Sequence, residues 1–204
     1  IHIFTEIEFL LFENKRVDGL IVVVRGNKIV DAVLIEVKNK NNELDEKQIS
    51  DYAVISKAYA IKKLLTISNQ FVSFPTQSPI SAKIPKSVSL YHLSWSYILT
   101  IARILLIDND DNISDRDQIE IMREVVEYFE AQKSGVVGFK QMKQGWTEVV
   151  QKMNAGASLK LNDKSVDETV SSWLEEERDM ALILSRELGL LVRSGQKMYK
   201  KNLL

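Results

Sequence analysis

Residues 31–52 have the sequence DAVLIEVKNKNNELDEKQISDY, in which an apolar run leads directly into charged side chains. The run Ala32–Ile35 is typical of a strand inside a hydrophobic core. The same strand continues into Glu36 and Lys38, which are costly to bury. One interpretation is an ion pair at the surface, which contributes only ~0–1 kcal/mol and requires no special site. The other is a metal site at the end of the strand.

The preceding residues predict a partner strand for this segment. Residues 16–24, RVDGLIVVV, have strand character, and Gly26-Asn27 is a signal for a tight hairpin. Side chains alternate along a strand, so Glu36 and Lys38 share one face of theirs. Eight positions separate Asp18 from Gly26, and nine separate Asn27 from Glu36. We therefore expect Asp18 and Glu36 to lie side by side.

Two neighbouring carboxylates in a partly dry place repel each other unless a positive charge compensates them. A divalent cation supplies that charge, and oxygen ligands favour Mg²⁺ or Mn²⁺. The chain has no cysteine that would favour a softer metal. Lys38 is a cation placed to hold an attacking water or to steady a phosphate. This combination suits the hydrolysis of a phosphodiester.

The segments RVDGLI and LIEVK, followed by a predicted helix, resemble the PD-(D/E)xK nuclease superfamily, which has the restriction-endonuclease-like fold. The resemblance covers roughly residues 5–70. It implies that Asp18 and Glu36 are acidic metal ligands, that the backbone carbonyl of Val37 is a further ligand, and that Lys38 is the catalytic lysine. It also implies a nuclease acting on nucleic acid, with DNA as the expected substrate.

Gln48 and Tyr52 lie four residues apart on the predicted helix and so share a face. They resemble the Gln-x-x-x-Tyr signature beside the active site of the RecB-like and lambda-exonuclease-like branches. Val17 stands where the family has its nominal proline. The family's additional glutamate has no clear counterpart, and Glu6 is the preferred candidate over Glu8, Glu13 or a residue before Ile1.

The order of elements predicts an α/β fold in which helices flank a mixed central sheet, with a mostly helical C-terminal extension. We expect a nuclease-like core over residues 1–107 and a helical region over 108–204, which could pack on the same core. Several segments have strand or helix periodicity. The expected strands are 1–12, 16–24, 29–38, 64–72 and 87–95, and the expected helices are 46–63, 96–106, 114–132, short ones around Trp146, and 166–188.

Composition limits the other possibilities. The chain of 204 residues is 45% hydrophobic and 27% charged, as in ordinary globular proteins. It has no run of ~18 apolar residues that could span a bilayer, and no signal peptide, so we expect a cytoplasmic protein without a membrane partner. Residues 52–107 contain six Lys and Arg and no acid, which is either a phosphate-facing surface or a mostly buried core segment.

Two alternatives to an active nuclease remain open at this point. The near-neutral net charge of −1 and the uncertain glutamate favour a nuclease-fold module that binds nucleic acid or a partner protein without cutting. The acidic stretch 108–130 and the helices after it suggest instead an interaction scaffold. His92 is expected to be a structural histidine and Trp95 a core residue. The sequence also leaves open whether the chain forms a homodimer.

Overall fold

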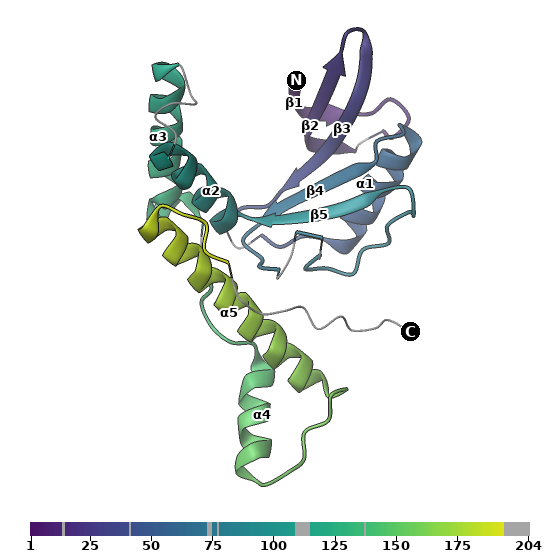
Figure 1. Ribbon diagram of the computed structural model, residues 1–204. Coiled ribbons are helices and arrows are strands. Elements are labelled where there is room, and N and C mark those ends of the chain that lie inside the picture. The colour runs from purple at the N-terminus through teal and green to yellow at the C-terminus, as the bar shows by residue number, and fades with distance from the viewer. Residues whose placement is uncertain are drawn as a thin grey trace. The chain divides into compact units, whose positions relative to one another are not determined.

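The computed structural model describes residues 1–13, 15–40, 42–72, 75–76, 78–108, 115–136 and 138–193. These residues form an α/β fold with a five-stranded mixed sheet and a helical C-terminal part, which confirms the predicted fold class (Figure 1). The elements are β1 (His2–Glu8), β2 (Arg16–Arg25), β3 (Lys28–Val37), α1 (Glu46–Ala58), β4 (Lys63–Ser68), β5 (Ser89–Ser94), α2 (Trp95–Asp108), α3 (Arg116–Glu130), η1 (Gln132–Ser134), α4 (Gln144–Asn154) and α5 (Lys164–Leu188).

Some predicted boundaries are wrong. The first strand ends at Glu8 and does not reach residue 12, and the strand expected over 64–72 ends at Ser68. The helix predicted over 46–63 ends at Ala58, because Ala60 adopts a left-handed φ of 55° and Lys63 already begins β4. Helical periodicity extends past this end because the residues that follow are also good helix formers.

The strands lie in the order β1-β2-β3-β4-β5, antiparallel from β1 to β3 and parallel from β3 to β5. Helix α1 connects β3 to β4 and covers one face of the sheet (Figure 1). Leu34, Ile49 and Leu64 are fully buried in the core between them. Because β3, β4 and β5 are parallel, their carboxyl ends meet at one edge of the sheet, and Glu36 is located there.

The hairpin of β2 and β3 turns at Gly26-Asn27, as the sequence predicts. Between the turn and the two acids, β3 has one residue more than β2, and a β-bulge accommodates it. Val24 pairs with Ile29, but Val23 pairs with Asp31, so the bulge lies at the intervening residue, Val30. Pairing then continues to Gly19 opposite Ile35. This register places Asp18 level with Glu36.

The chain divides into two contact-defined units. The first contains residues 1–99 and 124–138, and the second contains 100–123 and 139–204. The segment 124–138 therefore groups with the sheet, although the sequence analysis assigned it to the C-terminal region.

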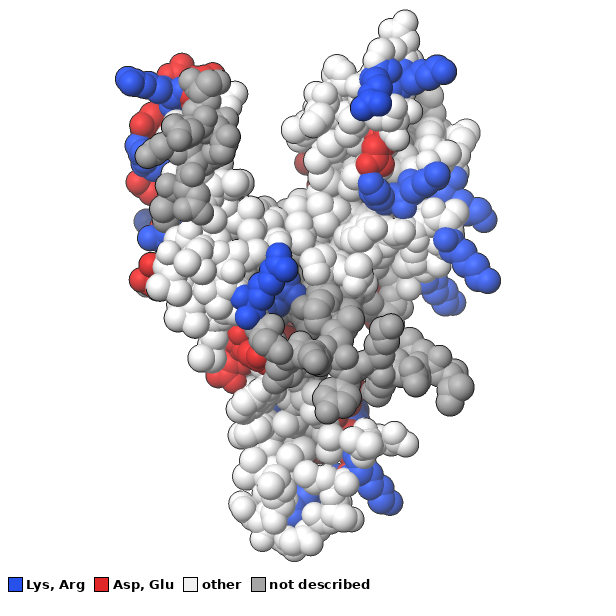
Figure 2. Space-filling model, in the orientation of Figure 1, with Lys and Arg blue, Asp and Glu red and all other residues white. Residues whose placement is uncertain are grey.

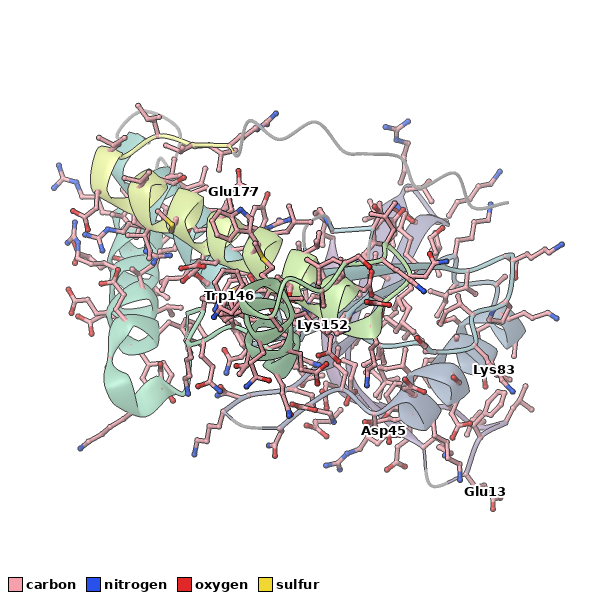
Figure 3. All side chains as sticks on the ribbon, turned by 90° about the horizontal axis from the view of Figure 1, so that it is seen from below. Glu13, Asp45, Lys83, Trp146, Lys152 and Glu177 are labelled. Atoms are coloured by element: carbon pink, nitrogen blue, oxygen red, sulfur yellow. The ribbon has the colours of Figure 1, made fainter. Side chains whose placement is uncertain are left out.

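Within the second unit, α4 and α5 pack closely together. A Cβ atom at Gly145 of α4 would lie 2.5 Å from the carbonyl oxygen of Ser165 on α5. Lys152, labelled in Figure 3, forms an ion pair with Asp163 at 3.1 Å. None of the helices in the described part of the chain combines the length and apolar character needed to cross a membrane.

Candidate active site

Asp18 lies where β2 and β3 stop pairing through their backbones. Its Oδ2 accepts a hydrogen bond of 2.7 Å from the backbone N–H of Val37. The side-chain carboxylate thus accepts the hydrogen bond that a backbone carbonyl would accept if the antiparallel ladder continued. This bond fixes Asp18 against the end of β3, one residue beyond Glu36.

Glu36 is almost completely buried, with a relative exposure of 1%. Its Oε1 accepts a hydrogen bond of 2.6 Å from Nζ of Lys38, whereas its Oε2 is buried without a hydrogen-bond partner in the described structure. Burial raises the pKa of Glu36 to about 7, because the Lys38 ammonium only partly offsets the effect of burial and the negative charge of Asp18 adds to it. Asp18 and Glu36 are therefore electrostatically coupled.

Lys38 is held in its charged form. Burial alone would lower the pKa of its ammonium group, but the hydrogen bond and charge of Glu36 and the charge of Asp18 outweigh this effect and raise the pKa above its ordinary value of 10.5. At neutral pH the side chain is therefore a proton donor and a positive charge. It cannot act as a general base there.

The pair of Glu36 and Lys38 is not an exposed surface ion pair. Its side chains are 1% and 22% exposed. A true surface pair exists on the same sheet, between Asp31 on β3 and Lys63 on β4, and both of its side chains are 40% exposed. The surface interpretation of the strand end is therefore wrong.

Gln48 and Tyr52 lie on α1, as predicted. The helix begins after Asp45, labelled in Figure 3, whose side chain accepts a hydrogen bond of 2.6 Å from the backbone N–H of Gln48. Nε2 of Gln48 donates to the hydroxyl of Tyr52 at 3.0 Å, and that hydroxyl donates to the carbonyl of Arg16 at 2.6 Å. The pair therefore fixes the start of β2, two residues before Asp18.

Tyr52 also experiences the charges of the site. Burial raises the pKa of its phenol, and the negative charges of Glu36 and Asp18 raise it further, against the opposing effects of Gln48 and Lys38. The phenol is thus neutral and a hydrogen-bond donor at physiological pH. Its role here is to hold backbone in place.

Glu6 does not join these residues. It has a positive φ of 56°, and the pairs Thr5–Gly19 and Ile7–Val17 on either side place it level with Asp18. Its side chain is 56% exposed and forms an ion pair with Arg16. The candidate for the additional family glutamate is therefore directed to a different partner.

A buried polar row extends from the site across the sheet, and the sequence analysis did not anticipate it as a unit. Thr66 on β4 is the register partner of both Glu36 on β3 and His92 on β5. Oγ1 of Thr66 lies 2.9 Å from Nδ1 of His92, whose Nε2 lies 2.7 Å from the carbonyl oxygen of Gln70. His92 is 0% exposed, which confirms its structural role. Polar residues at the ends of three apolar strands were the sequence signal for this row.

The donor set fits a hard divalent cation. Among the described residues no group of three or more His, Asp or Glu side chains is arranged to hold a metal, so the side-chain donors are the two carboxylates of Asp18 and Glu36. Oε2 of Glu36 is buried and has no hydrogen-bond partner among the described residues, and a buried acceptor without a partner costs about 1–3 kcal/mol. Mg²⁺ or Mn²⁺ prefers oxygen ligands of this kind.

Comparison with protein-family models, with curated proteins and with solved structures found no match to the chain. The geometry at the end of β3 is therefore the basis of the functional argument.

Proposed function

We propose that this chain is a metal-dependent nuclease that hydrolyses phosphodiester bonds in DNA. The observation that carries the proposal is the buried carboxyl group of Glu36, which lies close to Asp18. One of its oxygens is bonded to Lys38, and the other has no hydrogen-bond partner in the part of the chain that the structure describes. The resemblance to the PD-(D/E)xK superfamily gives the same assignment.

Asp18, Glu36 and the backbone carbonyl of Val37 would hold Mg²⁺ or Mn²⁺, which lowers the pKa of a bound water and neutralises charge on a phosphate. Lys38 remains protonated. It can donate a hydrogen bond to a phosphate oxygen or hold the attacking water. Gln48 and Tyr52 keep Asp18 in place by fixing the start of β2. Attack forms one P–O bond, breaks another, and leaves a phosphate and a hydroxyl.

One segment of the first unit carries exposed positive charge that would suit a polyanionic substrate, although the unit as a whole has no net charge. In Figure 2 several Lys and Arg side chains stand out from the visible face of the sheet-bearing part, with few acids among them. Four exposed lysines lie on a segment that contains no acid, and none of the four forms an ion pair within the described structure. They are Lys57, Lys62, Lys83 and Lys86. Such charges bind phosphates at low salt and lose affinity as salt increases.

The direct test is cleavage of plasmid and linear DNA in Mg²⁺ or Mn²⁺, with EDTA as the metal-free control. We expect Asp18→Asn and Lys38→Ala each to lower the cleavage rate by about 100-fold or more, as for groups that act on the transition state. The matched controls are Asp31→Asn and Lys63→Ala, which remove the exposed ion pair of the same sheet and should leave the rate unchanged. Undiminished cleavage by both site variants would remove these residues from the mechanism.

A second candidate is a module that binds nucleic acid without cutting it. The specific observation in its favour is that Glu6 pairs with Arg16, which leaves two carboxylates at the site among the described residues. Salt-sensitive DNA binding without cleavage in Mg²⁺ or Mn²⁺ would favour this candidate. If the chain binds no nucleic acid but a stable protein partner is recovered with it in a pull-down, the chain is instead an interaction scaffold.

A further inference from the structure

Lys38 is the first residue after β3, and hydrogen bonds hold its backbone on both sides. Its N–H donates to the carbonyl of Ile67 on β4 at 2.8 Å. Its own carbonyl accepts a hydrogen bond of 2.9 Å from the indole Nε1 of Trp95. The two bonds fix both peptide groups around the Lys38 Cα, so the remaining freedom lies in the torsions of the side chain.

Trp95 reaches Lys38 because of the sheet topology. It is the first residue of α2 and directly follows β5, without a connecting loop. The parallel order of β3, β4 and β5 brings the ends of these strands to one edge. The indole is stacked on the ring of Phe129, with centroids 5.0 Å apart and an interplanar angle of 28°. This stack holds the plane of the indole.

Two further hydrogen bonds connect Phe129 to Asn39, the residue after Lys38. The carbonyl of Phe129 accepts a hydrogen bond of 2.8 Å from Oγ of Ser134, which is 1% exposed. The carbonyl of Ser134 accepts one of 3.0 Å from Nδ2 of Asn39. Lys38, Trp95, Phe129, Ser134 and Asn39 thus form a closed circuit of contacts inside the first unit.

We propose that Trp95 is a positioning residue for Lys38, whose backbone carbonyl its indole N–H holds so that the ammonium group stays beside Glu36. The inference rests on the proposed nuclease function, because it gives Trp95 an effect on the reaction without contact with the substrate. Phe129, Ser134 and Asn39 keep the indole and the loop after β3 in place. The circuit therefore joins an active-site strand to a turn about a hundred residues later in the chain.

The test is the variant Trp95→Phe, which keeps an aromatic ring for the stack on Phe129 and removes the indole N–H. We expect kcat for DNA cleavage, per folded molecule, to fall by about tenfold or more while KM stays within about twofold, because the catalytic group is displaced rather than lost. Mn²⁺ binding, followed by calorimetry, should also stay within about twofold, since Trp95 does not bond to Asp18 or Glu36.

The matched control is Trp173→Phe in α5, where the same change is made at a side chain that is 53% exposed; its kcat should be unchanged. Asn39→Ala, which opens the circuit at another bond, should lower kcat in the same direction as Trp95→Phe. A purely structural role for Trp95 would lower the melting temperature and leave kcat per folded molecule as in the wild type, which overturns the inference.

Two results separate this inference from the proposed function. A wild-type chain that cleaves no DNA overturns the nuclease proposal, and the role of Trp95 falls with it. A wild-type chain that cleaves, together with an equally active Trp95→Phe, overturns the inference alone. Hydrogen exchange of the indole N–H gives a further readout that is independent of activity. It should be at least about tenfold slower at Trp95 than at Trp173, and equal rates would overturn the inference.

Discussion

Glu36 holds its proton more tightly in the folded chain than in the unfolded chain, because it is buried and lies close to Asp18. Its pKa is about 7 in the fold, against 4.5 as an ordinary glutamate. The folded state therefore binds this proton more tightly than the unfolded state between these two pH values. Stability must fall as pH rises through this window, by about 3 kcal/mol in total.

We expect Glu36→Gln to show this effect directly. In EDTA the variant should gain stability relative to the wild type between pH 5 and pH 8, because it has no carboxyl group to ionise. Urea denaturation at the two pH values measures the difference. Mn²⁺ should reduce the advantage of the variant at pH 8 by stabilising the ionised wild-type carboxylate. A stability difference that is the same at pH 5 and pH 8 would contradict the raised pKa.

At this scale the sequence predicted which residues meet, and the structure supplied their bonds. The proximity of Glu36 and Lys38 follows from side-chain alternation on one strand, and that of Gln48 and Tyr52 from helical spacing. The position of Asp18 beside Glu36 also depends on the bulge at Val30, which the sequence does not predict. The hydrogen bond from Tyr52 to the carbonyl of Arg16 could not be predicted, because it joins a side chain to a backbone group 36 residues away. The ion pair of Glu6 with Arg16 was also not predicted, because side-chain alternation does not reveal the positive φ of Glu6.

Among the elements, the turn after α3 is fixed by close packing. Gly135 follows η1 with a φ of 81°. A Cβ atom there would lie 2.5 Å from Cγ of Lys40 and 3.0 Å from Oδ1 of Asn39. Its carbonyl accepts a hydrogen bond of 2.6 Å from Nδ2 of Asn69. The turn therefore has no room for a larger residue against the loop after β3.

We expect Gly135→Ala to destabilise the first unit by more than Gly26→Ala does. Both positions have positive φ, which costs about 1–2 kcal/mol for alanine. Only Gly135 adds a steric clash, since a Cβ at Gly26 would meet nothing within 4 Å. Chemical denaturation of the two variants measures the difference. Equal destabilisation by the two variants would show that the backbone at Gly135 shifts to accept a Cβ atom without loss of stability.

The sequence predicted most elements but could not predict this contact. Periodicity and turn signals identify strands and helices locally, so the order from β1 to α5 was largely accessible. The docking of the turn at Gly135 on residues 39 and 40 depends on tertiary packing, for which no local pattern exists. The end of α1 at Ala58 was missed for a similar reason, because Ala60 takes a left-handed φ that its residue type does not announce.

For the whole molecule, the two contact-defined units should respond separately to changes in their cores. Leu34 is 0% exposed in the first unit and Leu182 is 3% exposed in the second. Each change to alanine should destabilise its own unit by about 2–5 kcal/mol. We expect Leu34→Ala to accelerate amide hydrogen exchange in the sheet and α1, and Leu182→Ala to do so in α4 and α5. Faster exchange in both units with either variant would show one cooperative fold.

The bulge at Val30 gives the hairpin an unusual sensitivity to length. From the turn, the pairs Arg25–Lys28 and Val24–Ile29 alone would set Asp18 against Ile35, on the face opposite Glu36. One exposed residue, about 20 Å along the strand from the two acids, thus decides whether they can share an ion. Deleting Val30, or inserting a residue beside it, would move Asp18 to the other face of the hairpin and abolish the site, although no site residue itself would be changed. In homologues of this chain, the tip of the hairpin should therefore tolerate substitutions far better than insertions or deletions.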